Sequence, residues 1–271
     1  MKSVGIALGG GGARGLCHIK FLEVIDELDI KPKIISGTSI GSIIGAFYAC
    51  GMKAESIEDM VKNMNLIDFS KMIDINLFAS KGLIRGKAFE NFLENILPIK
   101  RFEELPIPLK IVATNFWKRE QIVFDSGDII PAIRASISVP GVFSPMKIGD
   151  IVLTDGGSTN PVPFDIIYNH CDFTIAIDVS GKANPKSKKK IPTISQAVLT
   201  SFHTMEKAVV ENKMKIRKPD IFIKPNLYDI ELMEFHKYQE ILDSVENDTA
   251  IFKNELNKVF NKKNILPWLT N

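Results

Sequence analysis

The sequence of 271 residues is poor in cysteine and has no long apolar run. Its three cysteines, Cys17, Cys50 and Cys171, are scattered with no C-x-x-C pair, which favours reduced thiols and a cytoplasmic protein over a disulfide framework. No stretch approaches the ~18 apolar residues that a membrane-spanning helix needs, and the start of the chain has no signal-peptide pattern. Any contact with lipid is therefore expected to be peripheral.

Net charge is also small, because 34 basic residues stand against 32 acidic ones, which leaves +2. This balance indicates no general affinity for nucleic acid. The chain has one low-complexity charge run, KANPKSKKK at residues 182–190. We interpret this run as a solvated loop, with contact to an anionic surface as the alternative.

Short apolar runs alternate with helical patterns in the first part of the chain. Residues 4–8 and 33–36 are predicted strands, and helical patterns follow them over about 16–28 and 39–50. Strands joined through helices favour a parallel sheet in an α/β protein. More strands are predicted in four segments, of which the first two should pair: PIPLKIVATNF, EQIVFDSG, IVLTDGG and CDFTIAIDVSG. No repeat or linker divides the chain, so we expect one domain over residues 1–271, with a helical part over about 190–271.

A serine between two glycines stands where the second predicted strand turns into a helix, in Gly37-Thr38-Ser39-Ile40-Gly41. The G-x-S-x-G pattern is short enough to arise by chance, but a strand before it and a helix after it are what a nucleophilic serine needs. The sharp turn lifts the hydroxyl clear of the sheet, and the helix N-terminus favours developing negative charge. The alternative is that Ser39 only caps the helix, and the pattern leaves both open.

A second glycine run, residues 9–12, follows the first predicted strand. Gly10-x-Gly12-x-x-Gly15 matches a dinucleotide-binding fingerprint, but no acidic residue ends the second strand to hold a ribose. The run also lacks the Gly-Lys-Ser/Thr ending of a phosphate loop. Beside Ser39, its N–H groups instead predict an oxyanion hole, which can contribute about 3–4 kcal/mol to the barrier. The residues expected there are Gly10, Gly11 and Gly12, with Ile40 as a further donor and Arg14 as an orienting or positively charged neighbour.

A nucleophilic serine also needs a proton acceptor, and the histidines are poorly placed for that role. Two aspartates do follow predicted strands, Asp155 in IVLTDGG and Asp178 in IAIDVSG. A carboxylate at a strand end near a helix N-terminus can act as a direct base, but spacing alone does not separate the two. The four histidines lie within helical patterns or before a strand: His18, His170, His203 and His236.

Four blocks in order along the chain resemble the motifs of patatin-like phospholipases in their short bacterial form. They are residues 10–15 (GGGARG), 37–41 (GTSIG), 135–140 (ASISVP) and 155–157 (DGG). The likeness runs from about residue 4 to about 180, and Asn160-Pro161-Val162-Pro163 agrees with it. It implies a three-layer α/β/α fold and a Ser39–Asp155 dyad without histidine, which selects Asp155 over Asp178. The glycines that belong to these blocks include Gly15, Gly37, Gly41, Gly156 and Gly157.

The resemblance implies a serine acyl hydrolase for fatty acyl esters, with phospholipids or lysophospholipids as the leading substrates. Asp155 would take the Ser39 proton, and water would then cleave the acyl-enzyme. We expect no metal or cofactor, since the chain shows no ligand spacing. Apolar residues in INLFASKGLIRGKAFENFL, residues 75–93, could line an acyl groove or form a cover, although most are expected in the core. The alternative functions are a nucleotide-binding module that uses the N-terminal glycine loop and a catalytically silent scaffold.

Overall fold

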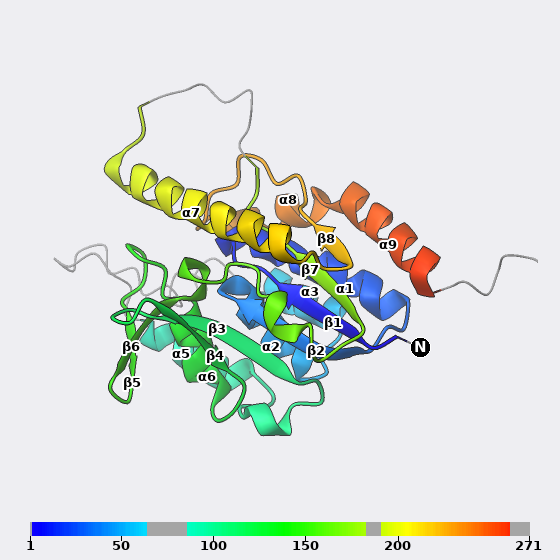
Figure 1. The fold of residues 1–271 in the computed structure, drawn as a ribbon, viewed down its shortest axis with the longest axis horizontal. Coiled ribbons are helices and arrows are strands. Elements are labelled where there is room, and N and C mark those ends of the chain that lie inside the picture. Colours follow the sequence, from blue (N-terminus) through cyan, green and yellow to red (C-terminus); the bar gives the residue numbers. More distant parts are fainter. Residues whose placement is uncertain (1, 64–85, 183–190, 261–271) are drawn as a thin grey trace, which may run out of the picture.

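The computed structural model describes residues 2–63, 86–182 and 191–260, and its centre is a mixed sheet of eight strands (Figure 1). The sheet order is β5-β6-β3-β2-β1-β7-β8, with β4 paired to β3 outside this path. Neighbours among β1, β2, β3, β7 and β8 are parallel, whereas β4, β5 and β6 form antiparallel pairs. The strands are β1 Val4–Leu8, β2 Pro32–Thr38, β3 Leu109–Asn115, β4 Glu120–Phe124, β5 Met146–Ile148, β6 Ile151–Asp155, β7 Phe173–Ile177 and β8 Ile221–Ile223.

Helical layers cover both faces of the sheet, as the alternating side chains of β1 require. Ile6 and Leu8 pack into the larger core with the helices of one face, while Ala7 packs with Val210 of α7 on the other. The expected three-layer α/β/α fold is confirmed. The α-helices are α1 His18–Glu27, α2 Ile40–Ala49, α3 Ala54–Asn63, α5 Lys87–Ile96, α6 Ile129–Ser136, α7 Ile194–Ile216, α8 Tyr238–Asp243 and α9 Glu246–Phe260. Short 3₁₀ helices are η1 Gly12–Cys17, η2 Phe102–Glu104, η3 Gly156–Ser158, η4 Asp165–Ile167 and η5 Phe235–Lys237.

Most of the predicted elements are present. PIPLKIVATNF and EQIVFDSG form the antiparallel pair β3 and β4. The segment AIRASISVPGVFSP begins within helix α6, which its serine and proline content does not predict; Pro131 is tolerated because it lies in the first turn. Strands β5 and β8 span three residues each, too few to produce a periodic signal. The charge run from residue 183 to 190 and the part of the suggested acyl groove up to residue 85 lie outside the described residues.

Two strands share one edge of β3, and this arrangement positions the site. Thr38, the last residue of β2, pairs with Val112, while Asp155, the last residue of β6, pairs with the next residue, Ala113. Strand β4 occupies the opposite edge. Because β2 runs parallel to β3 and β6 runs antiparallel to it, the carboxyl ends of β2 and β6 meet end to end.

Helix α2 approaches the end of β1 closely at Gly41. A Cβ atom there would lie 2.1 Å from the Leu8 carbonyl oxygen, whereas at Gly45, one turn later, the nearest atom is a side-chain methyl at 3.2 Å. We expect Gly41→Ala to lower the free energy of unfolding by about 2 kcal/mol or more, because backbone must shift. The matched variant Gly45→Ala should change it by less than about 1 kcal/mol, since alanine favours the helix. Urea denaturation tests this, and equal stability of the two variants would contradict the close approach.

Candidate active site

Ser39 occupies the corner between β2 and α2, in the strand-turn-helix setting that the sequence predicts. Its backbone has φ 53° and ψ −126°, a conformation that costs a non-glycine residue about 1–3 kcal/mol. Hydrogen bonds on both sides hold this corner: the Ser39 N–H donates to Ser136 Oγ at 2.8 Å, and its carbonyl accepts from the Ser42 N–H at 2.8 Å. The backbone of Ser39 is therefore held in place, and the residue is 7% exposed.

Asp155 ends β6 and is 2% exposed. Oδ1 accepts the Gly157 N–H at 2.7 Å, while Oδ2 is buried with no hydrogen-bond partner among the described residues. Burial and the negative charge of Glu206 raise the pKa of Asp155 to about 8, against the lowering effects of the Gly157 N–H and the Ser39 hydroxyl. The Ser39 hydroxyl thus lies near the Asp155 carboxyl, close enough to lower its pKa.

Glu206 of α7 is a site residue that the sequence analysis missed. Its carboxylate packs on the backbone of Gly157, where a Cβ atom would lie 2.0 Å from Glu206 Oε1, so a side chain at this position would displace the Glu206 carboxylate. The other oxygen, Oε2, lies 2.8 Å from His203 Nδ1. Glu206 stands 51 positions after Asp155 in a helix without any motif, and no sequence signal could have found it.

The glycine loop lies directly against Ser39. A Cβ atom on Gly10 would lie 3.3 Å from Ser39 Cβ. The Gly10 N–H is already used, because it donates to the Pro161 carbonyl at 2.9 Å. Gly11 and Gly12 follow, and Gly12 faces the same cavity as Ser39 and Ile40. These two glycines and Ile40 are therefore the better placed of the expected donors.

Two side chains brace this loop, the half-buried Arg14 and the fully buried His18. Arg14 donates to the carbonyls of Ser180 and Ile230, each at 2.8 Å, so it ties η1 to two distant segments and has an orienting role. His18 Nε2 lies 2.9 Å from the Gly9 carbonyl oxygen. Burial lowers the pKa of His18 to about 4, against the raising effect of the Gly9 carbonyl, so the imidazole is neutral at pH 7. Gly15 allows α2 to pack against η1, since a Cβ there would lie 2.1 Å from Ile40 Cγ2.

The segment ASISVP holds the two halves of the site together. Ser136 accepts the Ser39 N–H, and the Ser138 carbonyl accepts the Asp155 N–H at 3.0 Å. Arg134 is buried and donates to Ser138 Oγ at 2.7 Å. This block therefore bridges the two halves of the site, a role that its sequence pattern does not predict.

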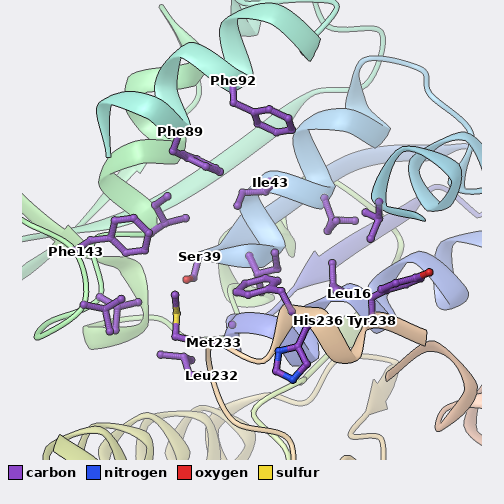
Figure 2. A pocket seen from close by; sticks show the side chains of 18 of the residues that line it. Leu16, Ser39, Ile43, Phe89, Phe92, Phe143, Leu232, Met233, His236 and Tyr238 are labelled. Carbon is purple, nitrogen blue, oxygen red and sulfur yellow. The ribbon is translucent and has the colours of Figure 1, made fainter. Parts of the chain in front are cut away.

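An apolar cavity of about 460 Å³ opens beside Ser39 (Figure 2). Apolar side chains from α2, α5 and the segment around Leu232 surround the serine, among them Ile43 and Phe89. Asp155 is not among the residues that line it, so the carboxyl lies behind the serine, away from the cavity. Apolar residues in the segment 75–93 were predicted to line an acyl groove or form a cover, and two of them, Phe89 and Phe92, line this cavity.

The other candidate bases lie elsewhere. Asp178, which follows β7, is held by Lys224 at 2.8 Å and accepts the Ser180 N–H at 2.9 Å. His236 lines the cavity, but Figure 2 shows its ring turned away from Ser39. Spacing alone leaves Asp155 and Asp178 open, whereas geometry separates them.

Comparison with known proteins identifies the family of the chain. The profile of the patatin-like phospholipase family matches residues 6–168, more than half of the chain. The chain belongs to the patatin-like phospholipase family. The expected resemblance is thereby confirmed for this patatin-like protein.

The relatives and structural neighbours of the patatin-like protein differ in how much of this chain and of their own length the alignment covers. An uncharacterized NTE family protein of Mycobacterium tuberculosis is 30% identical over 71% of this chain and 53% of its own length. Lysophospholipase NTE1 of Kluyveromyces lactis is 26% identical over 89% of this chain and 18% of its own length. VipD of Legionella pneumophila superposes with a TM-score of 0.65 and 14% identity, over 94% of this chain and 67% of VipD. The patatin-like protein therefore spans about half the length of its mycobacterial relative, and VipD shares its fold.

Within residues 2–63, 86–182 and 191–260, no helix of the patatin-like protein has both the length and the apolar character needed to cross a membrane.

Glu206→Gln should lower the pKa of Asp155 from about 8, because the charge of Glu206 is one of the two causes that raise it. The pKa can be followed by ¹³C NMR titration of the aspartate carboxyl carbons. Glu211→Gln, an exposed change on the same helix, is the matched control and should leave the pKa of Asp155 in place. An unchanged pKa in Glu206→Gln would show that burial alone is responsible.

Proposed function

We propose that this protein is a serine acyl hydrolase that cleaves fatty acyl esters of phospholipids or lysophospholipids with a Ser39–Asp155 dyad. The observation that carries the proposal is a buried carboxyl, with its pKa raised to about 8, directly behind a serine that opens into an apolar cavity. Membership of a phospholipase family supports the same reaction class.

In the first step, Asp155 accepts the hydroxyl proton of Ser39 while the serine oxygen attacks the ester carbonyl. The tetrahedral intermediate collapses, the bond to the alcohol leaving group breaks, and the leaving group takes up the proton from Asp155. In the second step, Asp155 takes a proton from water, the resulting hydroxide attacks the acyl-enzyme, and Ser39 is released with its proton restored. A base with a pKa near 8 suits this task better than a free aspartate with a pKa of about 3.9.

The oxyanion would be bound by backbone N–H groups of Gly11 and Gly12, with Ile40 as a further donor. The turn at Ser39 supports this assignment, since it places the start of α2 beside the glycine loop. The N–H of Gly10 is not free to bind the oxyanion, because it donates to the Pro161 carbonyl. We expect Gly10 to shape the site through its lack of a side chain instead. Its absence of a Cβ lets the loop approach Ser39 closely.

The cavity favours an acyl chain as the group bound beside Ser39. Its lining includes aromatic and aliphatic side chains such as Phe89, Phe143 and Leu232. Apolar surface buried on binding contributes about 25 cal/mol per Å². The site would receive its lipid from a membrane surface by peripheral contact. A nucleotide-binding role finds no comparable support, since the glycine loop faces this apolar cavity.

Ser39→Ala and Asp155→Asn should each lower kcat on a soluble p-nitrophenyl ester by at least about a thousandfold, because the nucleophile or its base is lost. A fluorophosphonate probe should label the wild-type protein and not Ser39→Ala. Asp178→Asn is the matched control, and we expect it to keep activity within about tenfold of wild type. If Asp155→Asn were fully active and Asp178→Asn inactive, the base would be Asp178, which follows β7, and the assignment to Asp155 would be wrong.

The rate should rise with pH and level off above the pKa of Asp155, about 8, because only the ionised carboxylate can accept the serine proton. Glu206→Gln should move the midpoint of the kcat/KM profile to lower pH, whereas Glu211→Gln should not. A rate that falls as the pH rises toward 8 would contradict a carboxylate base.

A further inference from the structure

Glu206 is a buried acidic residue to which the proposed mechanism gives no role as acid or base. Helix α7 lies across one face of the sheet (Figure 1), and Val210 on its inner side packs into the core there. Phe202 stands one turn before Glu206 and Val210 one turn after it, so the carboxyl shares an apolar side of the helix. Removing a carboxylate from water is costly unless neighbouring groups compensate it. The neighbours of Glu206 therefore decide where its charge and any bound proton lie.

The first neighbour is Asp155, so α7 and β6 bring two buried carboxyls together. Both approach Gly157, where a Cβ atom would lie 2.0 Å from Glu206 Oε1 and 2.9 Å from Asp155 Oδ1. These two oxygens are therefore within about 5 Å of each other, a separation at which like charges hinder one another's ionisation. Besides Glu206, the Gly157 N–H and the Ser39 hydroxyl act on the Asp155 carboxyl. In such a pair, one carboxyl keeps its proton to a higher pH than the other.

The second neighbour is His203, which lies on the far side of Glu206 from Asp155. Its Nδ1 is 2.8 Å from Glu206 Oε2. A carboxylate can only accept hydrogen bonds, so Nδ1 carries the hydrogen, and it can do so in the neutral imidazole as well as in the imidazolium. The side chains of His203 and Glu206 are only 23% and 10% exposed, so water competes little for this bond. A hydrogen bond to the ionised form of a carboxyl favours that form, and His203 thus stabilises the charge on Glu206.

The cation that acts on Glu206 favours the same distribution of charge. Arg14, in η1, is attracted by the charge of Glu206. Two further carboxylates, those of Glu231 and Glu234, act on Arg14 in the same way. Asp155, by contrast, has a carboxyl oxygen, Oδ2, that is buried without a hydrogen-bond partner in the described part of the chain. The surroundings therefore favour the negative charge on Glu206 and the proton on Asp155.

We propose that Asp155 and Glu206 hold one proton between them at neutral pH, and that His203 is a positioning residue that keeps the charge on Glu206 and the proton on Asp155. Asp155 can accept the hydroxyl proton of Ser39 only after its own proton has left. His203 would therefore set the pH at which the site becomes active, without touching the substrate. In this respect the inference rests on the proposed function, whereas the placement of the proton does not.

Two substitutions of equal size at His203 test the placement of the proton. The side-chain amide of His203→Asn can place an N–H close to the position of Nδ1, whereas His203→Leu has no donor. In His203→Leu we expect the pKa of Asp155 to fall from about 8 to about 7 or below, because Glu206 then takes up the proton. In His203→Asn it should stay near 8. The measurement is a ¹³C NMR titration of the carboxyl carbons, in which the signal of Asp155 is the one missing from Asp155→Asn.

The pH profile of hydrolysis gives a second readout. His203→Leu should raise kcat/KM on a soluble p-nitrophenyl ester at pH 6.5 by about fivefold or more, because more of the Asp155 carboxyl is ionised there, and should leave it within about twofold at pH 9.5. Loss of a merely structural contact would lower kcat/KM at every pH. The double variant His203→Leu/Glu206→Gln should have the profile of Glu206→Gln alone, since His203 acts through Glu206.

Three results would overturn the proposal: an unchanged pKa of Asp155 in His203→Leu, a His203→Asn variant that behaves like His203→Leu, and a double variant in which the pKa of Asp155 falls below its value in Glu206→Gln. If circular dichroism shows that His203→Leu is not folded, His203→Ala removes the same N–H without adding apolar surface and takes its place. The NMR titration needs no catalysis. A protein that meets the NMR expectations but does not cleave esters would therefore refute the proposed function and leave the placement of the proton intact.

Discussion

The end-to-end meeting of β2 and β6 on one edge of β3 is the constraint on which the site depends. Thr38 and Asp155 pair with consecutive residues of β3, so the serine that follows β2 and the aspartate that ends β6 are brought together by main-chain pairing. A shift of one residue in either strand would turn its side chains to the other face of the sheet. The position of Ser39 relative to Asp155 is therefore set by sheet register more than by the loops around them.

Several unfavourable features are concentrated at this junction and are stabilised by their neighbours. Ser39 has a strained backbone, and Asp155 buries a carboxyl oxygen that finds no hydrogen-bond partner in the part of the chain that the structure describes. Ser136 and Ser138 hold the two residues from one side, while the Asn160 carbonyl accepts the Thr38 hydroxyl at 2.7 Å from another. Strain and incomplete hydrogen bonding of this kind persist only where the surrounding structure enforces them, and they cluster at functional sites.

The sequence predicts those parts of the structure that have a local signal. Strand β1, the turn at Ser39 and the β3–β4 pair follow from apolar periodicity and glycine positions, and these predictions are confirmed. The meeting of the ends of β2 and β6 on one edge of β3 could not be predicted, because contact between chain segments more than a hundred residues apart leaves no local pattern. The same holds for Glu206, which reaches the site only through the packing of α7. The resemblance to a family selected Asp155, whereas spacing alone could not.

Two buried groups, His18 and Asp155, change the stability of the fold in opposite directions as the pH changes. The folded protein holds His18 with a pKa of about 4, below the ordinary value of 6.5, so this residue destabilises the fold as the pH drops from 6.5 toward 4. It holds Asp155 with a pKa of about 8, above the ordinary value of 3.8, so this residue destabilises the fold as the pH rises from 3.8 toward 8. At low pH His18, which contacts the glycine loop, becomes charged while buried. At high pH the buried carboxyl of Asp155 becomes charged. The ionisation of Asp155 that the proposed mechanism requires thus also lowers the stability of the fold around it.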